Sequence, residues 1–364
     1  MRIKHVHLEN FKRFVTLDIP IQNSLTEDIA SQFLLLGDNG SGKTSVLQAI
    51  ALCLSMVSRK TRNVVEFDWL GWVPGRYSRW GKPFIEIEVH FTDDEIDATQ
   101  EAARRWYESL NGHAKDEFRA PASSKVVYIR LDGGYYTTKS GLQAEQFQFQ
   151  GRNYAASLLR TDQSARDLFD RLPGVFWFDQ FRNLASQPEE NTTEEVKSTG
   201  RISYSVGVER LRKHLNAWQI NRLMKGTPKK DFLKELEDAY RRVFQGRSFG
   251  SPEPMYSGGN PSPEDMYFIL NDGNRSYDIQ EMSAGEQSVF PILYEFIRQS
   301  IRNSVVLIDE IDLNLHPPLA QALLTTLPSL GPDCQFILTT HSEAITDIFN
   351  PNQVHRLPGG KLCL

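Results

Sequence analysis

Residues 37–44 read Gly-Asp-Asn-Gly-Ser-Gly-Lys-Thr, and this segment restricts the fold more than any other part of the chain. An apolar run of strand length, residues 33–36, comes directly before it, and a helix-like stretch, residues 45–55, follows. A strand, a glycine-rich loop and a helix in this order form a phosphate-binding loop. Its glycines let the backbone curl without clashes at Cβ, so that N–H groups can surround a polyphosphate.

The end of this loop carries side chains that suit a polyphosphate and a metal ion. Lys43 would place a point charge against the β- and γ-phosphates, and the hydroxyl of Thr44 is a ligand for Mg²⁺, a cation that prefers oxygen. The alternative is a glycine-rich turn before an ordinary helix. We predict a binding loop formed by Gly37, Asp38, Asn39, Gly40, Ser41, Gly42, Lys43, Thr44 and Ser45.

A second candidate region begins with the apolar run at residues 304–308, which is too short for a helix and ends in Asp309 and Glu310. Such runs are typical of buried parallel strands. Ligands bind at the carboxyl ends of strands in α/β sheets, so Asp309 is expected to hold Mg²⁺ through water and Glu310 to polarise the attacking water. The alternative is a chance acidic turn after a core strand.

Two further segments extend the pattern. Residues 282–287 read Met-Ser-Ala-Gly-Glu-Gln and lead into an amphipathic helix, so the Ser283 hydroxyl and the Gly285 backbone would form an anion site at a helix N-terminus. The same residues also make a good N-cap without any ligand. Residues 335–340 predict another core strand, with His341 at its end.

The order of these motifs resembles that of the ABC-type ATPases. The resemblance implies that ATP and Mg²⁺ are the ligands and that Ser283, Gly285 and Glu286 grip the γ-phosphate held by the opposite subunit. It also implies a D-loop at residues 311–317, a switch histidine at His341, and a Q-loop glutamine that contacts Mg²⁺ and water. Position assigns this glutamine to Gln180, with Arg182 as the alternative.

The opening residues 3–14 resemble the first strands of the RecF, SMC and OLD-like group, the AAA_15 and AAA_21 branch of these ATPases. In that group the basic pair after Asn-Phe lies near the nucleotide. Lys12 and Arg13 are therefore candidates for base or ribose contacts, and a solvated hairpin is the alternative.

The fold class that follows is an α/β P-loop head of the ABC type, with a mixed or parallel core sheet and an N-terminal antiparallel β layer. Residues 83–91 and 124–138 predict further strands of that layer, and residues 93–110 predict a helix. We expect residues 1–180 and 265–364 to form the head, residues 200–246 to form a helical hairpin insertion, and residues 185–199 and 246–265 to be mobile loops. Charged residues of the hairpin, with helices at 206–223 and 230–244, either meet nucleic acid or are simply solvated.

The composition limits the classes of protein to which this chain can belong. The formal net charge of −5 argues against a protein coated for nucleic acid, although a local basic patch would suffice for binding. Three scattered cysteines exclude a disulfide framework or a zinc site. Neither a membrane helix nor a signal peptide is predicted, so we expect a cytoplasmic protein with no membrane contact.

The resemblance implies an ATPase that dimerises around ATP. The short insertion and the Leu-Asn-Leu-His-Pro sequence resemble stand-alone ATPases of anti-phage systems such as Septu, PARIS and retrons. This implies a sensor or regulatory scaffold for a separate effector, a nuclease, with no nuclease in this chain. The alternative is a RecF-like DNA-binding clamp in DNA repair, and the long interval between Thr44 and Ser283 disfavours a transporter ATPase.

Overall fold

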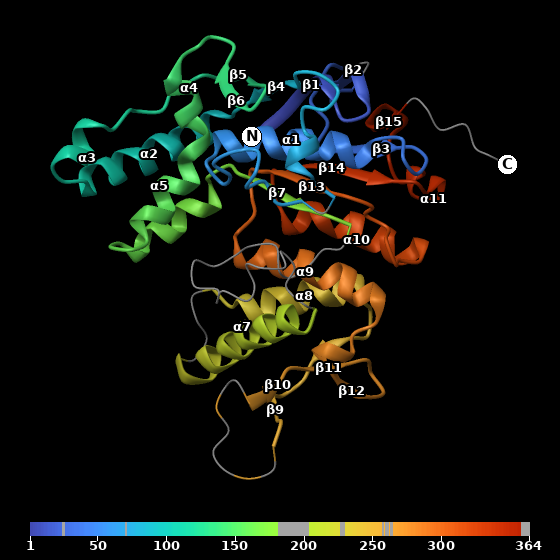
Figure 1. The fold of residues 1–364 in the computed structure, drawn as a ribbon. Helices are drawn as coiled ribbons and strands as arrows, with labels where there is room; N and C mark the ends of the chain where they lie inside the picture. The colour runs from blue at the N-terminus through green and yellow to red at the C-terminus, as the bar shows by residue number, and fades with distance from the viewer. Residues whose placement is uncertain are drawn as a thin grey trace. The chain divides into compact units, whose positions relative to one another are not determined.

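The computed structural model describes residues 1–23, 26–69, 71–180, 204–225, 230–256, 258, 262 and 265–357. The chain divides into two compact units (Figure 1). The first unit comprises Met1–Gln180, Ser300–Asp312 and Gly331–Leu364. The second unit comprises Phe181–Gln299 and Leu313–Leu330.

Helix α1 (Lys43–Val57) is the centre of the first unit, and 13 of its 15 residues are buried. A helix that is apolar on all sides must be covered on all sides. It contacts strands of an antiparallel sheet and strands of a parallel sheet, and it lies between the two (Figure 1). Each large aliphatic side chain buried here contributes roughly 2 kcal/mol of transfer free energy.

The antiparallel sheet has the order β2-β1-β4-β5-β6. Its predicted strands are confirmed, and a turn between Asp132 and Tyr135 joins β5 to β6. The alternating pattern of β4 buries Ile85, Ile87 and Val89 toward the core. The strands are β1 (Arg2–Phe11), β2 (Phe14–Pro20), β4 (Phe84–His90), β5 (Val126–Asp132) and β6 (Tyr135–Thr138).

The second sheet is parallel throughout, with the order β15-β3-β14-β13-β7. All residues of β13 and β14 are buried, as expected for central strands covered on both faces. Parallel strands bring their carboxyl ends to one edge. The strands are β3 (Gln32–Leu36), β7 (Val175–Phe178), β13 (Val305–Ile308), β14 (Gln335–Thr340) and β15 (Val354–Arg356).

One buried amide joins the two sheets. Gln335 of β14 accepts a hydrogen bond from the Ile3 backbone N–H at 2.6 Å and donates to the carbonyl oxygens of Ile3 at 2.8 Å and Ala30 at 3.0 Å. The side chain therefore bonds the backbone of Ile3, which pairs with Val89 of β4 but precedes the paired residues of β1 and β2.

Further helices and 3₁₀ turns complete the first unit. Helix α2 begins with the capping box of Thr92 and Glu95, and the helix predicted at residues 93–110 is confirmed. Its alanine face packs on α5, a helix that the sequence pattern did not identify. The helices are α2 (Asp93–Ser109), α3 (His113–Asp116), α4 (Gln143–Phe147), α5 (Gly151–Leu158) and α11 (Glu343–Thr346), with 3₁₀ turns η1 (Pro74–Arg76), η2 (Gln148–Gln150), η3 (Gln163–Asp170) and η6 (Pro351–Gln353).

The second unit is mainly helical. The predicted hairpin helices are observed as α7 (Tyr204–Lys225) and α8 (Phe232–Val243), which pack on each other. Helix α8 also packs on α9 (Ala284–Arg298) and α10 (Pro317–Leu330). The segment expected as a loop at residues 246–265 differs from that expectation, because β8 pairs with β11 and β9 pairs with β10. The short strands are β8 (Ser248–Phe249), β9 (Glu253–Pro254), β10 (Met266–Tyr267), β11 (Ile269–Asn271) and β12 (Ser276–Asp278), followed by the 3₁₀ turn η5 (Ile279–Glu281).

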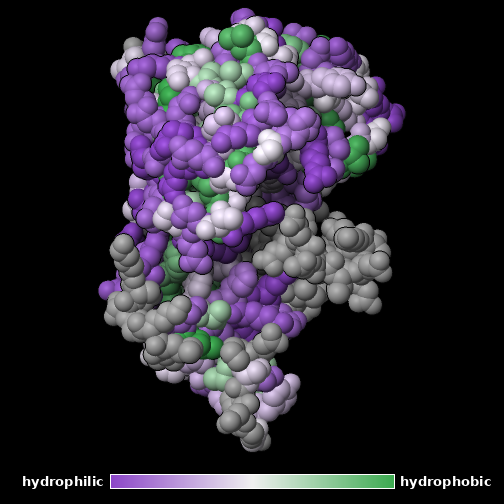
Figure 2. Space-filling model, turned by 90° about the vertical axis from the view of Figure 1, so that its left-hand side faces the viewer, coloured by the Kyte–Doolittle hydropathy of each residue, from purple (hydrophilic) through white to green (hydrophobic). Residues whose placement is uncertain are grey.

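Across the described ranges, no helix is both long and apolar enough to span a membrane. The face drawn in Figure 2 is dominated by hydrophilic residues, and its hydrophobic residues form small groups rather than a continuous band.

We predict that Gln335→Leu lowers the free energy of unfolding by about 3 kcal/mol, because three buried backbone groups lose their partner. Urea unfolding followed by circular dichroism measures this change. The exposed residue Gln321 on α10 provides the control, since Gln321→Leu leaves no buried group unpaired. Equal midpoints for wild type and Gln335→Leu would show that the amide does not stabilise the contact between the sheets.

Candidate nucleotide site

The glycine-rich loop lies between the end of β3 and the first residue of α1. Gly42 adopts a φ of 101°, and a Cβ there would come within 2.4 Å of the Phe14 ring and 2.7 Å of the Arg13 side chain. Only glycine therefore fits between α1 and the turn that joins β1 to β2. This close approach places Arg13, one of the two predicted basic contacts, directly beside the loop.

Within the loop, polar groups point inward to where phosphates would bind. The buried ammonium of Lys43 donates to the carbonyl oxygens of Gly37 at 2.7 Å and Asp38 at 3.1 Å. Burial lowers the pKa of Lys43, and the carboxylates of Glu310 and Asp309 oppose this shift. The Ser41 hydroxyl is buried and has no hydrogen-bond partner among the described residues. Phosphate oxygens are acceptors that would satisfy both donors, so the loop fits a polyphosphate.

A chain of hydrogen bonds joins the loop to the acidic pair after β13. Thr44 donates through Oγ1 to Asp309 Oδ2 at 2.7 Å, although the two residues lie 265 positions apart. Thr339 of β14 donates to the other Asp309 oxygen at 2.6 Å, and the Glu310 backbone N–H donates to Thr339 Oγ1 at 2.7 Å. Asp309 is fully buried, so these hydroxyls replace the water that its carboxylate has lost.

Glu310 occupies a left-handed backbone conformation, with a φ of 47°. This conformation is costly for a residue with a side chain, and it persists here because the Glu310 N–H is anchored to Thr339. The turn directs the chain out of β13 at the carboxyl edge of the sheet. Backbone strain of this kind is common where a side chain must be aimed at a ligand.

The other predicted catalytic residues follow neighbouring strands at the same edge. His341 comes directly after β14 and is exposed, while Gln180 lies two residues beyond the end of β7 and is half-buried. Strands β14 and β7 flank β13 on its two sides, so the fold brings His341 and Gln180 to the edge that carries Asp309 and Glu310. Arg182 and residues 185–199 lie outside the described residues.

A cavity of about 640 Å³ opens beside the loop. Its lining has three cations and no carboxylate, and it combines them with aromatic rings; the lining residues are Asn10, Lys12, Arg13, Phe14, Val15, Gly71, Trp72, Val73, Arg76, Tyr77 and Trp80. A nucleotide has a flat base and negatively charged phosphates, so flat apolar surfaces and cations together suit it.

Two polar groups in the cavity, those of Lys12 and Tyr77, would be stabilised by a ligand with acceptor atoms. Burial lowers the pKa of Lys12 to about 8, and its ammonium lies 5.0 Å from the centre of the Trp72 ring and donates to Gln48 of α1. The Tyr77 hydroxyl is buried and has no hydrogen-bond partner among the described residues. A ligand with acceptor atoms would satisfy Tyr77 and stabilise charged Lys12, which fits the predicted base or ribose contact of Lys12 and Arg13.

The predicted γ-phosphate contacts Ser283, Gly285 and Glu286, which resemble the signature motif of ABC-type ATPases, belong to the second unit. Ser283 is the N-cap of α9, where it forms a capping box with Glu286. A Cβ on Gly285 would lie 3.3 Å from the Asn314 carbonyl oxygen, so a side chain there would press on the predicted D-loop. Glu286 differs from the expectation of a nucleotide contact: it is 1% exposed, and its carboxylate is bonded to protein groups.

Three basic residues of the hairpin form ion pairs within the unit. Arg212 is buried and pairs with Asp278, Arg222 pairs with Asp231 at 3.2 Å, and Lys213 pairs with Glu209. These pairs reduce the positive surface available to nucleic acid.

Sequence reasoning missed Thr339, although it holds both acidic residues in place. The available signal was a pair of threonines closing an otherwise apolar strand, because a buried hydroxyl in a core strand requires a partner. It also missed Arg76 and Tyr77, which lie in an irregular segment without periodicity.

A family model described as "AAA domain, putative AbiEii toxin, Type IV TA system", AAA_21, matches residues 33–347, which is more than half of the chain. The match runs from β3 to α11 and includes every motif of the site except the β1–β2 turn.

Curated relatives share 21% to 23% sequence identity with this chain. The Retron Vc95 probable ATPase of Vibrio cholerae is 23% identical, over 97% of this chain and 73% of that protein. The Retron Ec83 probable ATPase of Escherichia coli is 22% identical, over 99% of this chain and 72% of that protein. The Septu protein PtuA of Bacillus mycoides is 21% identical, over 93% of this chain but only 38% of that protein.

Solved structures share the fold. An SMC head bound to the C-terminal winged-helix domain of ScpA aligns with a TM-score of 0.50 and 15% identity, over 95% of this chain and 92% of that chain. The predicted fold class, an α/β head of this type, is confirmed.

We predict that Thr339→Val weakens Mg²⁺-dependent nucleotide binding by about tenfold or more, because partners that orient a metal-binding carboxylate typically carry effects of this size. Valine has nearly the same shape but leaves Asp309 and the Glu310 N–H each one bond short. Titration of a fluorescent ATP analogue with and without Mg²⁺ measures the change, and Thr325→Val on the exposed side of α10 serves as the control. Unchanged Mg²⁺ dependence would remove Thr339 from the site.

We also predict that nucleotide affinity falls by about fivefold from about pH 7 to about pH 9, because Lys12 is charged below its lowered pKa and neutral above it. In Lys12→Arg the charge persists across this range, so the decline should be smaller. The same titration repeated at each pH measures both slopes. Parallel pH profiles would show that Lys12 does not face the ligand.

Proposed function

The chain belongs to the AAA_21 family of AAA domains, and we propose that it binds ATP with Mg²⁺ and hydrolyses the ATP to ADP and phosphate. The observation that carries this proposal is the 2.7 Å contact between Thr44 and Asp309. It brings together the hydroxyl and the carboxylate that a magnesium site on a phosphate-binding loop requires, from segments far apart in the sequence.

Each residue at the edge of the parallel sheet has a distinct part in this proposal. Lys43 and the loop N–H groups neutralise the phosphates, and Thr44 and Asp309 hold Mg²⁺, the latter through water. When bound, Mg²⁺ supplies charge neutralisation at the β- and γ-phosphates. Glu310 accepts a proton from the attacking water, while His341 and Gln180 position the γ-phosphate and that water.

Among the described residues, no group of three or more His, Cys, Asp or Glu side chains could hold a metal. The hydroxyl of Thr44 and the carboxylate of Asp309 suit Mg²⁺, which keeps several waters and uses only one or two protein ligands beside the phosphate oxygens. Thr44 and Asp309 are therefore sufficient as direct and water-mediated ligands.

The active form in this proposal is a homodimer that closes around ATP. Ser283 and Gly285 lie at the N-terminus of α9, where backbone N–H groups and the helix dipole favour an anion. The resemblance to ABC-type ATPases supports a contact in trans, in which these residues meet the γ-phosphate held by the partner's loop.

For the biological role we propose a cytoplasmic sensor or regulatory scaffold in anti-phage defence, which controls a separate effector, a nuclease. The names of the retron ATPases and of the Septu protein support this role. The RecF-like DNA clamp is the weaker candidate, because Arg212, Lys213 and Arg222 are paired with carboxylates.

We predict that Glu310→Gln keeps ATP affinity within about threefold of wild type and lowers turnover by about 100-fold or more, the usual contribution of a positioned base. Rapid-quench measurement of phosphate release, with binding measured in parallel, separates the two effects.

The exposed Glu343 pairs with Arg356 on the surface, so Glu343→Gln is the matched control and should hydrolyse ATP normally. Normal turnover by Glu310→Gln would contradict the proposed role of Glu310 and the assignment of the site.

A further inference from the structure

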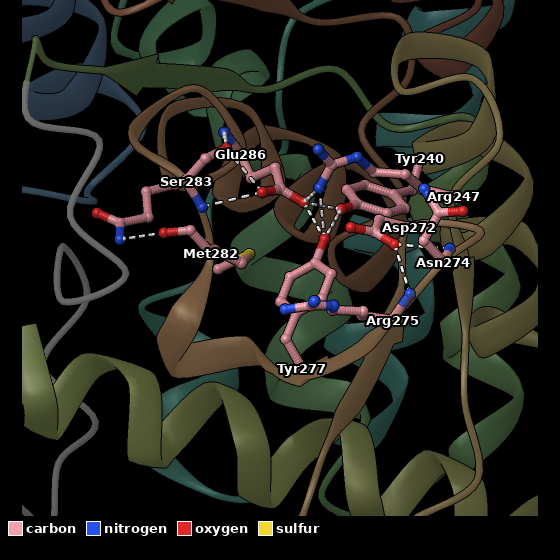
Figure 3. Close-up of polar contacts among 10 residues, drawn as sticks. Tyr240, Arg247, Asp272, Asn274, Arg275, Tyr277, Met282, Ser283 and Glu286 are labelled. Atoms are coloured by element: carbon pink, nitrogen blue, oxygen red, sulfur yellow. Dashed lines mark hydrogen bonds and ion pairs between the residues drawn. The ribbon is translucent and has the colours of Figure 1, made fainter.

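Glu286 is the hub of a polar cluster in the second unit, which is drawn in Figure 3. One of its carboxylate oxygens accepts hydrogen bonds from the hydroxyls of Tyr240 and Tyr277 and from the guanidinium of Arg247. The other oxygen accepts from the Ser283 backbone N–H at 2.9 Å and from the Ser283 hydroxyl at 2.6 Å. The carboxylate is thus shared between the signature serine and residues of other elements.

The cluster joins three separate segments to the start of α9. Tyr240 lies in α8 and is fully buried, Arg247 follows α8 just before β8, and Tyr277 lies in β12. The two tyrosine hydroxyls are also 3.3 Å from each other. The position of Ser283 is therefore fixed by α8 and β12 through a single carboxylate.

The charge of Glu286 requires compensation. Burial by itself would raise the pKa of Glu286, but hydrogen bonds from Ser283, Tyr240 and Tyr277 outweigh burial and hold the pKa below its usual value. Glu286 is therefore a buried anion in the first turn of α9, close to the place where Ser283 would meet a phosphate. An uncompensated carboxylate there would repel that phosphate, and Arg247 carries the only positive charge that the structure places on this carboxylate among the described residues.

The Ser283 hydroxyl has one proton, and in this structure it donates that proton to Glu286. A phosphate that accepts a hydrogen bond from the same hydroxyl must compete with Glu286 for it. The three donors on the other oxygen of Glu286 disperse the negative charge of the carboxylate. The hydrogen bond that Glu286 accepts from the Ser283 hydroxyl is therefore weaker than it would be without these donors.

We propose that Arg247, with Tyr240 and Tyr277, is a positioning residue for the signature serine: it neutralises Glu286 so that Ser283 is oriented but remains free to bind a phosphate. This inference rests on the proposed ATP-dependent dimer and adds a set of residues that control its formation. Arg247 belongs to the second unit, where its guanidinium donates to Glu286 and to the Tyr277 hydroxyl, and in this proposal it acts on Ser283 through Glu286.

The test compares Arg247→Met with Arg247→Lys and with the double variant that combines Arg247→Met and Glu286→Gln. ATPase rate is measured against protein concentration, and ATP binding is measured separately in dilute protein. Arg247→Met should raise the protein concentration for half-maximal activity by about tenfold or more, with ATP affinity unchanged. Arg247→Lys keeps the charge and should remain close to wild type.

The double variant distinguishes charge compensation from a structural role. Removing the Glu286 charge should restore much of the activity lost in Arg247→Met. If Arg247 served only packing, the second substitution would instead lower the activity further. Arg241→Met is the matched control, because Arg241 lies on the exposed side of α8, paired with Glu237, and should behave as wild type.

Equal losses in Arg247→Met and the double variant, or wild-type behaviour of Arg247→Met, would overturn the inference while leaving the proposed function intact. A wild-type protein whose ATPase rate per chain is independent of protein concentration would instead overturn the dimer and the inference together.

Discussion

The hydrogen bond from Thr44 to Asp309 is the contact on which the rest of the site depends. It requires a helix that begins at the edge of the parallel sheet and a strand that ends there. The strand order β3-β14-β13 meets this requirement with one strand between the two, and that strand supplies Thr339, which bonds Asp309 and the Glu310 N–H. A buried carboxylate is stable only when fully bonded, so the same bonds that stabilise Asp309 also fix its direction.

Asp309 and Glu286 are almost fully buried carboxylates near the proposed binding sites, and their surroundings differ. Asp309 is bonded by neutral hydroxyls, which leaves its negative charge available to a metal ion. Glu286 is bonded by a guanidinium as well as by hydroxyls, which cancels its charge beside a helix N-terminus. The contrast follows from electrostatics, because a cation site needs a free negative charge whereas a phosphate site must not have one.

Much of the fold could be predicted because its signals are local. Continuous apolar runs identified the buried strands β13 and β14, and the loop composition placed the start of α1 at Ser45, whereas the helix begins at Lys43. The role of Thr339, the cavity residues Arg76 and Tyr77, and the inward direction of Glu286 could not be predicted, because each depends on a partner far away in the sequence. The motif that suggested a phosphate contact for Glu286 is compatible with a capping box, and tertiary contacts decided between these two interpretations.

The proposal requires a catalytic site built from the loop of one subunit and the signature serine of another, and subunit mixing measures this directly. Lys43→Ala lacks the loop cation, and Ser283→Arg blocks the signature serine, so each should be inactive alone. Mixed in equal amounts, they form dimers with one intact site, and activity should return to about one quarter of wild type if pairing is random and the sites act independently. A mixture that stays inactive, although both proteins are folded and exchange subunits, would contradict a shared site.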